Sequence, residues 1–412
     1  MSGFRFQRKL VQVEEAQQAV LRYARLQAAE RVPLAESFGR RLAEPVAASH
    51  PVPHFRRSGV DGYAVYAADS VDASPDRSVS LQVTEMIPAG SMPSQRVERG
   101  QAARIMTGAA VPDGADAVIM LEMTESSDDE VRIRKRMSAG ENITPIGQEV
   151  LEGEPLLQPG RTLGAGEAAV LATFGYEHVN VYRKPRVAIF STGSELLEVG
   201  SQLQPSKIRN SNSYMIASLV HNAGAVPLIM PILPDEPEQV EQALLDVLEE
   251  VDCIVTTGGV SVGDKDVLVD LFERWDGLLL FNKVAMRPGS PTSVGVWRDK
   301  LIFALSGNPG ASFVGFQLFV RPFLRSAMGH PRAIASPISG FIGTDYSKGS
   351  AYPRYVRGVM KFDNGQVNVK PAGEDKSSIM VSIKDADCLI YIPAGGRGAA
   401  AGDQVRIFPI ND

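Results

Sequence analysis

Three short segments in the second half of the chain are rich in glycine, serine and threonine, and each follows an apolar, strand-like stretch. They read STGSE from Ser191, TTGGVSVG from Thr256 and SGNPG from Ser306. Glycine lets backbone N–H groups come close to an anion, and a helix beginning there favours negative charge. One such segment is equally explained as a tight turn between a strand and a helix, but three together favour a phosphate or another oxyanion as ligand. The residues predicted to bind it are Thr192, Gly193, Ser194, Thr257, Gly258, Gly259, Ser261, Gly263, Ser306, Gly307, Asn308 and Pro309.

The third segment has the residue order of a helix start. Asn308 is suited to the capping position and Pro309 to the first helical position. The unpaired N–H groups of that first turn are therefore expected to face the ligand.

Carboxylates gather near the same segments. Glu195 ends the first segment, Asp235 follows the next apolar stretch, and Asp264 and Asp266 follow the second segment. Oxygen ligands beside a phosphate suit Mg²⁺, so Glu195, Asp235 and Asp266 are candidate metal ligands. The alternative is that these acids cap helices, because a carboxylate in a first turn complements the helix dipole. For Asp235 the capping role is at least as well supported.

Two cations frame the segment KVAMRPG. Lys283 and Arg287 leave a strand-like stretch together, and positive charge beside the acids would suit a dianionic oxyanion. The alternative is an exposed strand end whose charges are simply solvated.

Composition excludes several classes of protein. The 412 residues carry 42 basic and 48 acidic side chains, a net charge of −6, without a dense Lys/Arg run, which argues against nucleic-acid binding. The glycine segments match neither the GxGxxG fingerprint nor a Walker lysine, which disfavours a dehydrogenase or a P-loop ATPase. Cys253 and Cys388 lie far apart, and Cys253 is expected to be a core residue. With no signal peptide and no membrane-spanning stretch, the expected location is the cytoplasm.

The elements that must position these residues are strands alternating with helices. RVAIF (186–190), AVPLIMPIL (225–233), DCIVTT (252–257) and LIFAL (301–305) are predicted strands. Helices are expected between them, capped by Asn212 and by Asp235, and a further helix is predicted over 13–27. This alternation predicts a mainly parallel, doubly wound α/β sheet whose ligands bind at the carboxyl ends of its strands. Residues 45–147 are β-rich, and the chain after about 330 is all β, with Asp363-Asn364-Gly365 as a hairpin turn.

Seven motifs in fixed order resemble those of the molybdopterin molybdenumtransferase (MoeA) family, to which the C-terminal domain of gephyrin is related. The resemblance covers essentially the whole chain. The motifs are SGVDGYA from Ser58, MTGAAVPDGADAV from Met106, GENITPIGQEV from Gly140, STGSEL from Ser191, TGGVSVGDKD from Thr257, KVAMRPG from Lys283 and SGNP from Ser306.

The resemblance implies four domains: a helical base (1–45 plus 148–183), a β-rich lasso (46–147), a molybdopterin-binding α/β domain (184–328) and a small C-terminal β-barrel-like domain (329–412). It also implies a homodimer whose active cleft is shared between the α/β domain of one subunit and the lasso of the other. Matched position by position, the active-site residues include Asp61, Thr107, Glu195, Asp235, Asp266, Lys283 and Pro309.

The implied reaction inserts molybdate into adenylylated molybdopterin, with Mg²⁺-dependent release of AMP. The dithiolene of the pterin would supply the sulfur ligands, which agrees with the scarcity of cysteine. Ser194, Arg287, Ser290 and Ser306 depart from the family pattern, which puts the molybdate contacts in doubt. The resemblance leaves open whether a partner molybdopterin adenylyltransferase supplies the substrate. The alternatives are the preceding adenylylation of molybdopterin by ATP, and a scaffold role like that of gephyrin.

Overall fold

The computed structural model describes residues 9–127, 129–260 and 267–410. The chain divides into two compact units. The smaller unit comprises residues 45–158 and 167–176, and the larger unit comprises the rest. Each is described separately.

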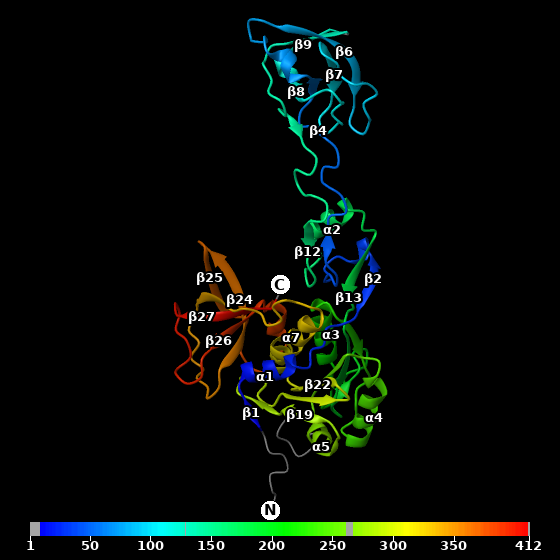
Figure 1. Cartoon of the computed structure of the whole chain (residues 1–412). Coiled ribbons are helices and arrows are strands. Elements are labelled where there is room, and N and C mark those ends of the chain that lie inside the picture. The colour runs from blue at the N-terminus through cyan, green and yellow to red at the C-terminus, as the bar shows by residue number, and fades with distance from the viewer. Residues whose placement is uncertain (1–8, 128, 261–266, 411–412) are drawn as a thin grey trace, which may run out of the picture. The chain divides into compact units, whose positions relative to one another are not determined.

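The larger unit is built on a six-stranded sheet (Figure 1). Its strands, in spatial order, are β17 (Val226–Ile229), β14 (Arg186–Ser191), β18 (Cys253–Thr257), β22 (Lys300–Leu305), β21 (Ser293–Trp297) and β19 (Leu278–Phe281). The first four are parallel, whereas β21 and β19 are antiparallel to their neighbours. The prediction of a mainly parallel α/β sheet is confirmed.

Side-chain alternation along the strands explains why helices cover both faces of this sheet. Val187 and Ile189 of β14 join one apolar cluster, and Ala188 and Phe190 join another. The first cluster packs against α1 (Val13–Leu21), α3 (Asn212–Asn222), α6 (Pro309–Gly315) and α7 (Arg321–Ala327). The second packs against α4 (Pro237–Leu248) and α5 (Val267–Arg274). Cys253 is fully buried, and this burial raises the pKa of its thiol, as expected of a core residue rather than a nucleophile.

Three helix predictions were wrong in detail. The helix expected over 13–27 ends at Leu21, and the N–H of Gln27 instead donates to the Ala327 carbonyl. The helix expected to be capped by Asn212 is capped by Ser211, with Asn212 as its first residue. Likewise Glu236, not Asp235, occupies the capping position of α4.

Short strand pairs complete the N-terminal part of the larger unit. β1 (Leu10–Val11) pairs with β20 (Lys283–Val284), and β2 (Ala29–Pro33) pairs with β13 (His178–Tyr182). Another short pair joins β15 (Leu196–Leu197) to β16 (Ile208–Arg209).

The C-terminal residues form a closed five-stranded barrel. Its strands, in spatial order, are β23 (Ile338–Ile342), β25 (Gln366–Pro371), β24 (Arg354–Asp363), β26 (Cys388–Ile392) and β27 (Gln404–Pro409). The hairpin turn predicted between β24 and β25 is confirmed, because Asn364 and Gly365 both have positive φ.

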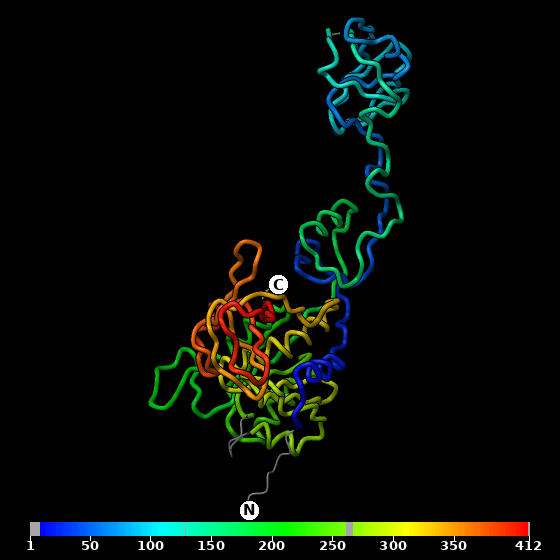
Figure 2. The backbone as a smooth tube through the Cα atoms, turned by 90° about the vertical axis from the view of Figure 1, so that its left-hand side faces the viewer, coloured from blue at the N-terminus to red at the C-terminus, as the bar shows by residue number. Residues whose placement is uncertain are grey.

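The smaller unit contains its own six-stranded sheet. The spatial order is β8 (Ala117–Met120), β5 (Gly62–Val65), β7 (Gln101–Ile105), β6 (Val79–Ile87), β10 (Glu130–Ile133) and β9 (Thr124–Ser126). The chain enters and leaves it along paired segments, visible side by side in Figure 2: β3 (Val46–Ala47) with β12 (Pro155–Leu157), and β4 (Arg57–Ser58) with β11 (Ile143–Thr144). The helix α2 (Ala165–Thr173) follows.

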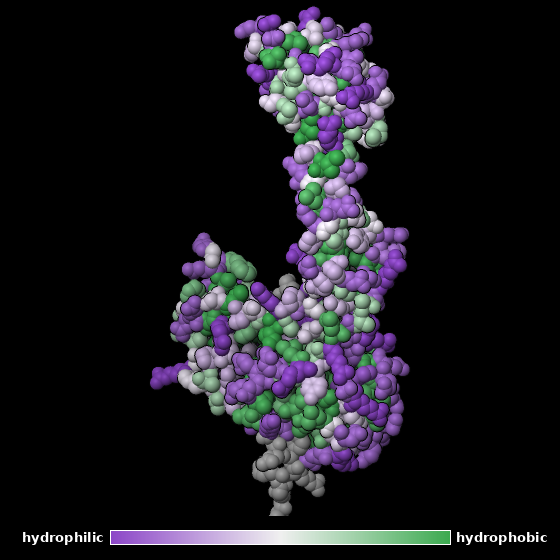
Figure 3. All heavy atoms as spheres, in the orientation of Figure 1, coloured by the Kyte–Doolittle hydropathy of each residue, from purple (hydrophilic) through white to green (hydrophobic). Residues whose placement is uncertain are grey.

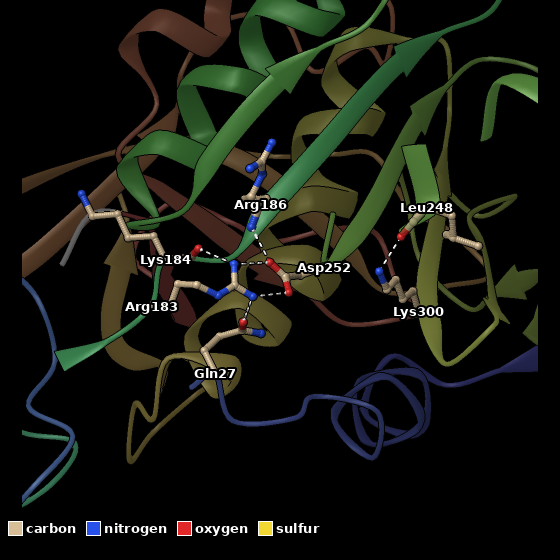
Figure 4. A network of polar contacts seen from close by, with 7 residues as sticks. All are labelled: Gln27, Arg183, Lys184, Arg186, Leu248, Asp252 and Lys300. Carbon is tan, nitrogen blue, oxygen red and sulfur yellow. Dashed lines mark hydrogen bonds and ion pairs between the residues drawn. The ribbon is translucent and has the colours of Figure 1, made fainter. Parts of the chain in front are cut away.

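A polar network fixes the amino-terminal ends of the parallel strands (Figure 4). Asp252, just before β18, accepts hydrogen bonds from both terminal nitrogens of Arg183, at 3.0 and 2.7 Å, and from the Arg186 backbone N–H at 2.7 Å. Arg183 also contacts Gln27, and Lys300 at the start of β22 donates to the Leu248 carbonyl. The Asp252 carboxylate raises the pKa of Arg183, so this ion pair persists at neutral pH. This network lies at the edge of the sheet opposite to the glycine-containing loops.

The visible molecular surface is mostly hydrophilic with scattered apolar residues (Figure 3). Across residues 9–127, 129–260 and 267–410, none of the helices has the length and apolar character needed to cross a bilayer.

Candidate active site

Three neighbouring parallel strands end side by side in the larger unit. The pairing register places Ser191, the last residue of β14, opposite Thr257 of β18, and Thr257 opposite Leu305 of β22. The segments that follow these residues line one cleft of about 770 Å³. Ligands of doubly wound sheets bind at this carboxyl edge. The ligand-binding candidates that line the cleft are Thr192, Gly193, Thr257, Gly258, Gly259, Ser306, Gly307, Asn308 and Pro309.

Ser194 is not among the cleft-lining residues, although its backbone N–H contacts a residue that is. Ser261, Gly263 and Asp266, together with Asp264, fall outside the described residues.

Several loop amides hold the loops to one another. The N–H of Thr192 donates to the Thr257 carbonyl at 3.0 Å, and the N–H of Gly258 donates to the Leu305 carbonyl at 3.1 Å. Gly258 has a φ of +98°, and a Cβ at this position would lie 2.6 Å from the Thr192 carbonyl oxygen. Only glycine fits there, so one role of the glycines is to bring neighbouring loops into contact.

The start of α6 differs from its prediction in one respect. Asn308 is the capping residue and Pro309 is the first helical residue, as predicted. The N–H of Gly310, however, donates to the Ser377 carbonyl at 2.8 Å, and the N–H of Ala311 donates to the Asn308 carbonyl at 3.0 Å. These two amides are therefore not free to bind an anion. The sequence could not reveal this, since Ser377 comes from a distant part of the chain.

A buried hydrogen-bond network lies beneath the loops, and sequence reasoning did not identify it. The Ser191 hydroxyl contacts Asn210 Oδ1 at 2.9 Å, the Ser213 hydroxyl at 2.9 Å and the Thr257 hydroxyl at 2.8 Å. All four residues are buried. Satisfied buried networks rigidify their surroundings, so this one fixes β14, β18 and the start of α3 relative to one another.

The two described carboxylates of the predicted metal site both line the cleft. The Glu195 carboxylate folds against Gly193, where a Cβ would lie 2.5 Å from Glu195 Oε2. Asp235 accepts the Ser194 N–H through Oδ2 at 3.0 Å, so it stabilises the neighbouring loop instead of capping its own helix. Among the described residues, no three potential ligands are grouped tightly enough to form a metal site.

The two predicted cations differ in their position relative to the cleft. Arg287 lines the cleft. Lys283 lies in β20, paired with Leu10, and is not among the cleft-lining residues. At two of the departures from the family pattern the side chain engages local backbone: the Ser290 hydroxyl donates to the Val284 carbonyl at 2.8 Å, and the Ser306 hydroxyl accepts the Asn308 N–H at 3.2 Å.

One wall of the cleft comes from the barrel region, which the sequence did not link to the site. Arg354, Asp375, Ser377 and Ser378 line it. Two backbone hydrogen bonds attach this wall to Arg287: its N–H donates to the Pro353 carbonyl at 2.9 Å, and its carbonyl accepts the Tyr355 N–H at 2.8 Å.

Asp61 and Thr107 form an exposed pair in the smaller unit. Asp61 Oδ1 accepts the Thr107 N–H at 2.6 Å and the Thr107 hydroxyl at 2.9 Å. These two hydrogen bonds, the backbone one first, hold the pKa of Asp61 below its usual value. The pair is therefore a fixed negative charge at neutral pH.

Family models match three consecutive regions of the chain. They are described as the MoeA N-terminal region (domains I and II), matching residues 11–175, a probable molybdopterin-binding domain, matching 188–326, and the MoeA C-terminal region (domain IV), matching 342–410.

Known proteins are similar over the whole length. The molybdopterin molybdenumtransferase of Bacillus subtilis is 40% identical over 406 residues, covering 98% of this chain and 94% of the relative. The enzyme of that name from Staphylococcus aureus strain MRSA252 is 39% identical over 401 residues, covering 97% and 96%. A crystal structure of the molybdopterin biosynthesis MoeA protein from Pyrococcus horikosii superposes with a TM-score of 0.86 at 30% identity, covering 98% of this chain and all of the other.

The fold and cleft define an α/β protein with a cleft at the carboxyl edge of its sheet, a closed β-barrel and a separate β-rich unit. Together with these similarities, they establish that the chain belongs to the molybdopterin molybdenumtransferase family.

Proposed function

We propose that this protein inserts molybdenum into molybdopterin, using molybdate and adenylylated molybdopterin and releasing AMP. The relatives named molybdopterin molybdenumtransferase support the transfer of molybdenum. The observation that carries the finer proposal is the cleft of about 770 Å³, which has three carboxylates, three guanidinium groups and three glycine-containing loops in its lining. Such a lining suits a phosphorylated organic ligand together with a second anion.

Mg²⁺ fits this donor set. Glu195 and Asp235 are the predicted metal ligands that line the cleft, and Mg²⁺ is usually held in proteins by one or two carboxylates together with phosphate oxygens and water. Asp266 is the third candidate ligand predicted from the sequence. When bound, the ion would neutralise charge on the phosphoanhydride.

The protein's own groups would bind and orient the reactants. The loops that follow β14, β18 and β22 would enclose the pyrophosphate, and the hydrogen bonds of Ser191 would fix the ends of β14 and β18. Asp235, tied to the Ser194 N–H, would hold its carboxylate at a constant place in the cleft. Arg287 would attract molybdate, a dianion, with Lys283 as a further candidate.

We further propose a homodimer in which Asp61 and Thr107 of one subunit complete the cleft of the other. Their fixed, exposed charge supports a role in contacting a ligand or its metal. An adenylyltransferase partner remains a candidate supplier of the substrate.

A defined mixture of protein, adenylylated molybdopterin, Mg²⁺ and molybdate tests the proposal, with AMP and metallated cofactor followed together. The expected result is release of both in equal amounts. Asp235→Asn keeps an oxygen for the Ser194 N–H but removes the charge, so AMP release should fall about a hundredfold while the fold is retained. Asp246→Asn, on the exposed side of α4, is the control.

AMP release by wild-type protein without metal insertion would contradict the coupling of the two events. An unchanged rate of AMP release in Asp235→Asn would contradict the proposed role of Asp235. Formation of adenylylated molybdopterin from ATP would instead indicate the preceding step.

A further inference from the structure

The barrel-side wall of the cleft carries a charged cluster that none of the motifs contains. Arg354 begins β24, and Asp375 follows β25 in the chain. Both line the cleft. The backbone fixes this wall, because Arg287 bonds to the residues on either side of Arg354 and Gly310 bonds to Ser377.

Two of the arginines that line the cleft are neighbours. Arg287 and Arg354 are direct partners in a parallel bridge. Paired residues in a sheet place their side chains on the same face, about 5 Å apart at Cβ. Two positive side chains therefore enter the cleft from adjacent backbone positions. An anion lying between or beside two positive groups would reduce their mutual repulsion.

Asp375 supplies part of that negative charge and orients Arg354. Its Oδ2 lies 3.5 Å from Arg354 Nη1 and also accepts the Tyr346 hydroxyl. The side chain of Asp375 is only 8% exposed, whereas that of Arg354 is 22% exposed. The carboxylate thus accepts a hydrogen bond from the Tyr346 phenol, and the guanidinium is the more exposed member of the pair.

The hydrogen-bonding capacity of Arg354 is not used up. Its Nε–H is buried and has no hydrogen-bond partner among the described residues. Its contact with Asp375 is too long for a strong hydrogen bond. An incoming oxyanion would supply acceptors to the guanidinium, and the planar group is suited to two parallel bonds with such an anion.

We propose that Arg354 binds a tetrahedral oxyanion of the substrates from the barrel side of the cleft, and that Asp375 and Tyr346 are positioning residues that act through it. The proposal rests on the function proposed above. The oxyanion is either molybdate or a phosphate of the adenylylated pterin, and the experiment separates the two.

Steady-state kinetics with each substrate varied in turn test the proposal. Arg354→Gln should raise KM about tenfold for molybdate if molybdate is the ligand, or for the pterin if its phosphate is, with kcat little changed. Asp375→Asn should raise the same KM by a smaller factor. Arg354→Gln combined with Asp375→Asn should be no worse than Arg354→Gln alone, because Asp375 acts only through the arginine. A merely structural role for Asp375 would give additive losses instead and would overturn its assignment.

Direct binding keeps this test separate from the test of the reaction. Titration calorimetry of molybdate and of inorganic phosphate requires no turnover. Arg354→Gln should weaken binding of at least one anion about tenfold. Arg397→Gln, an exposed barrel residue outside the cleft lining, should not. Unchanged binding of both anions and unchanged KM for both substrates in a folded Arg354→Gln protein would overturn the proposal, whatever reaction the protein catalyses.

Discussion

Several polar side chains in this protein form hydrogen bonds with backbone groups that are distant in the sequence. Asp235 is suited by type and position to cap the helix that follows it, yet its carboxylate bonds to the Ser194 N–H of a neighbouring loop. Asp61 similarly serves Thr107, which lies 46 positions away. In both cases a short polar side chain fixes a backbone segment beside a candidate site. The chemistry of the residue was evident from the sequence, but the identity of its partner was not.

The Asp61–Thr107 pair gives a prediction at this scale. Thr107→Val removes the hydroxyl donor but keeps the backbone N–H bond, so Asp61 becomes less firmly oriented. We expect molybdenum insertion to fall about tenfold, because misplacement of a positioned group by a fraction of an ångström has effects of this size. Thr107→Ser, which retains a hydroxyl, should restore most of the rate in the same assay. Equal rates for Thr107→Val and wild-type protein would remove the side chain from the proposed mechanism.

At the scale of elements, the junction between α6 and the barrel is the tightest contact beside the cleft. The Gly310 N–H bonds to Ser377, and a Cβ on Gly310 would lie 2.2 Å from Arg357 Nη1 and 3.0 Å from the Ser377 carbonyl oxygen. Arg357 cannot easily move aside, because it is buried and its guanidinium donates to the Lys376 carbonyl and the Ser382 hydroxyl.

Gly310→Ala should therefore lower the free energy of unfolding by about 1–3 kcal/mol, the usual cost of overpacking a buried site. Gly166→Ala is a matched control, since a Cβ at Gly166 has no neighbour within 4 Å. That change should be neutral or stabilising within α2. Urea denaturation of both variants measures the difference, and equal midpoints would show that Arg357 yields at little cost.

How much the sequence predicts depends on whether a feature is local. The alternation of strands and helices, the βα loops at one edge, the Asn308-Pro309 helix start and the Asn364-Gly365 turn follow from residue types within a few positions. The cleft wall carrying Arg354 and Asp375 could not be predicted in this way, because local sequence does not determine which distant loop a barrel strand contacts. The occupied Gly310 amide escaped prediction for the same reason.

At the scale of the whole larger unit, the two edges of the parallel sheet have opposite roles. The amino-terminal edge is tied together by Asp252, which accepts three hydrogen bonds from Arg183 and Arg186. The carboxyl edge carries the glycine-containing loops and the cleft. Stability and ligand binding are thus assigned to opposite ends of the same strands.

Asp252→Ala should accordingly lower stability without altering substrate binding. Hydrogen bonds to a charged group contribute about 1.5–3 kcal/mol, and the Asp252 side chain is 18% exposed, so we expect a loss of about 2 kcal/mol. Chemical denaturation monitored at neutral pH measures it, with KM for both substrates determined on the folded variant. A large change in either KM at unchanged stability would contradict this division of roles.

The paired segments at the entrance to the smaller unit have a consequence for how the chain tolerates change. Ala48 and Glu154 are separated by more than a hundred residues, yet the Ala48 N–H donates to the Glu154 carbonyl at 2.9 Å. The intervening stretch therefore begins and ends at the same place, as an insertion cassette does. Lengthening or shortening that cassette at sites away from Asp61 and Thr107 leaves the backbone on either side with the same two endpoints to join, so the rest of the chain should tolerate such changes.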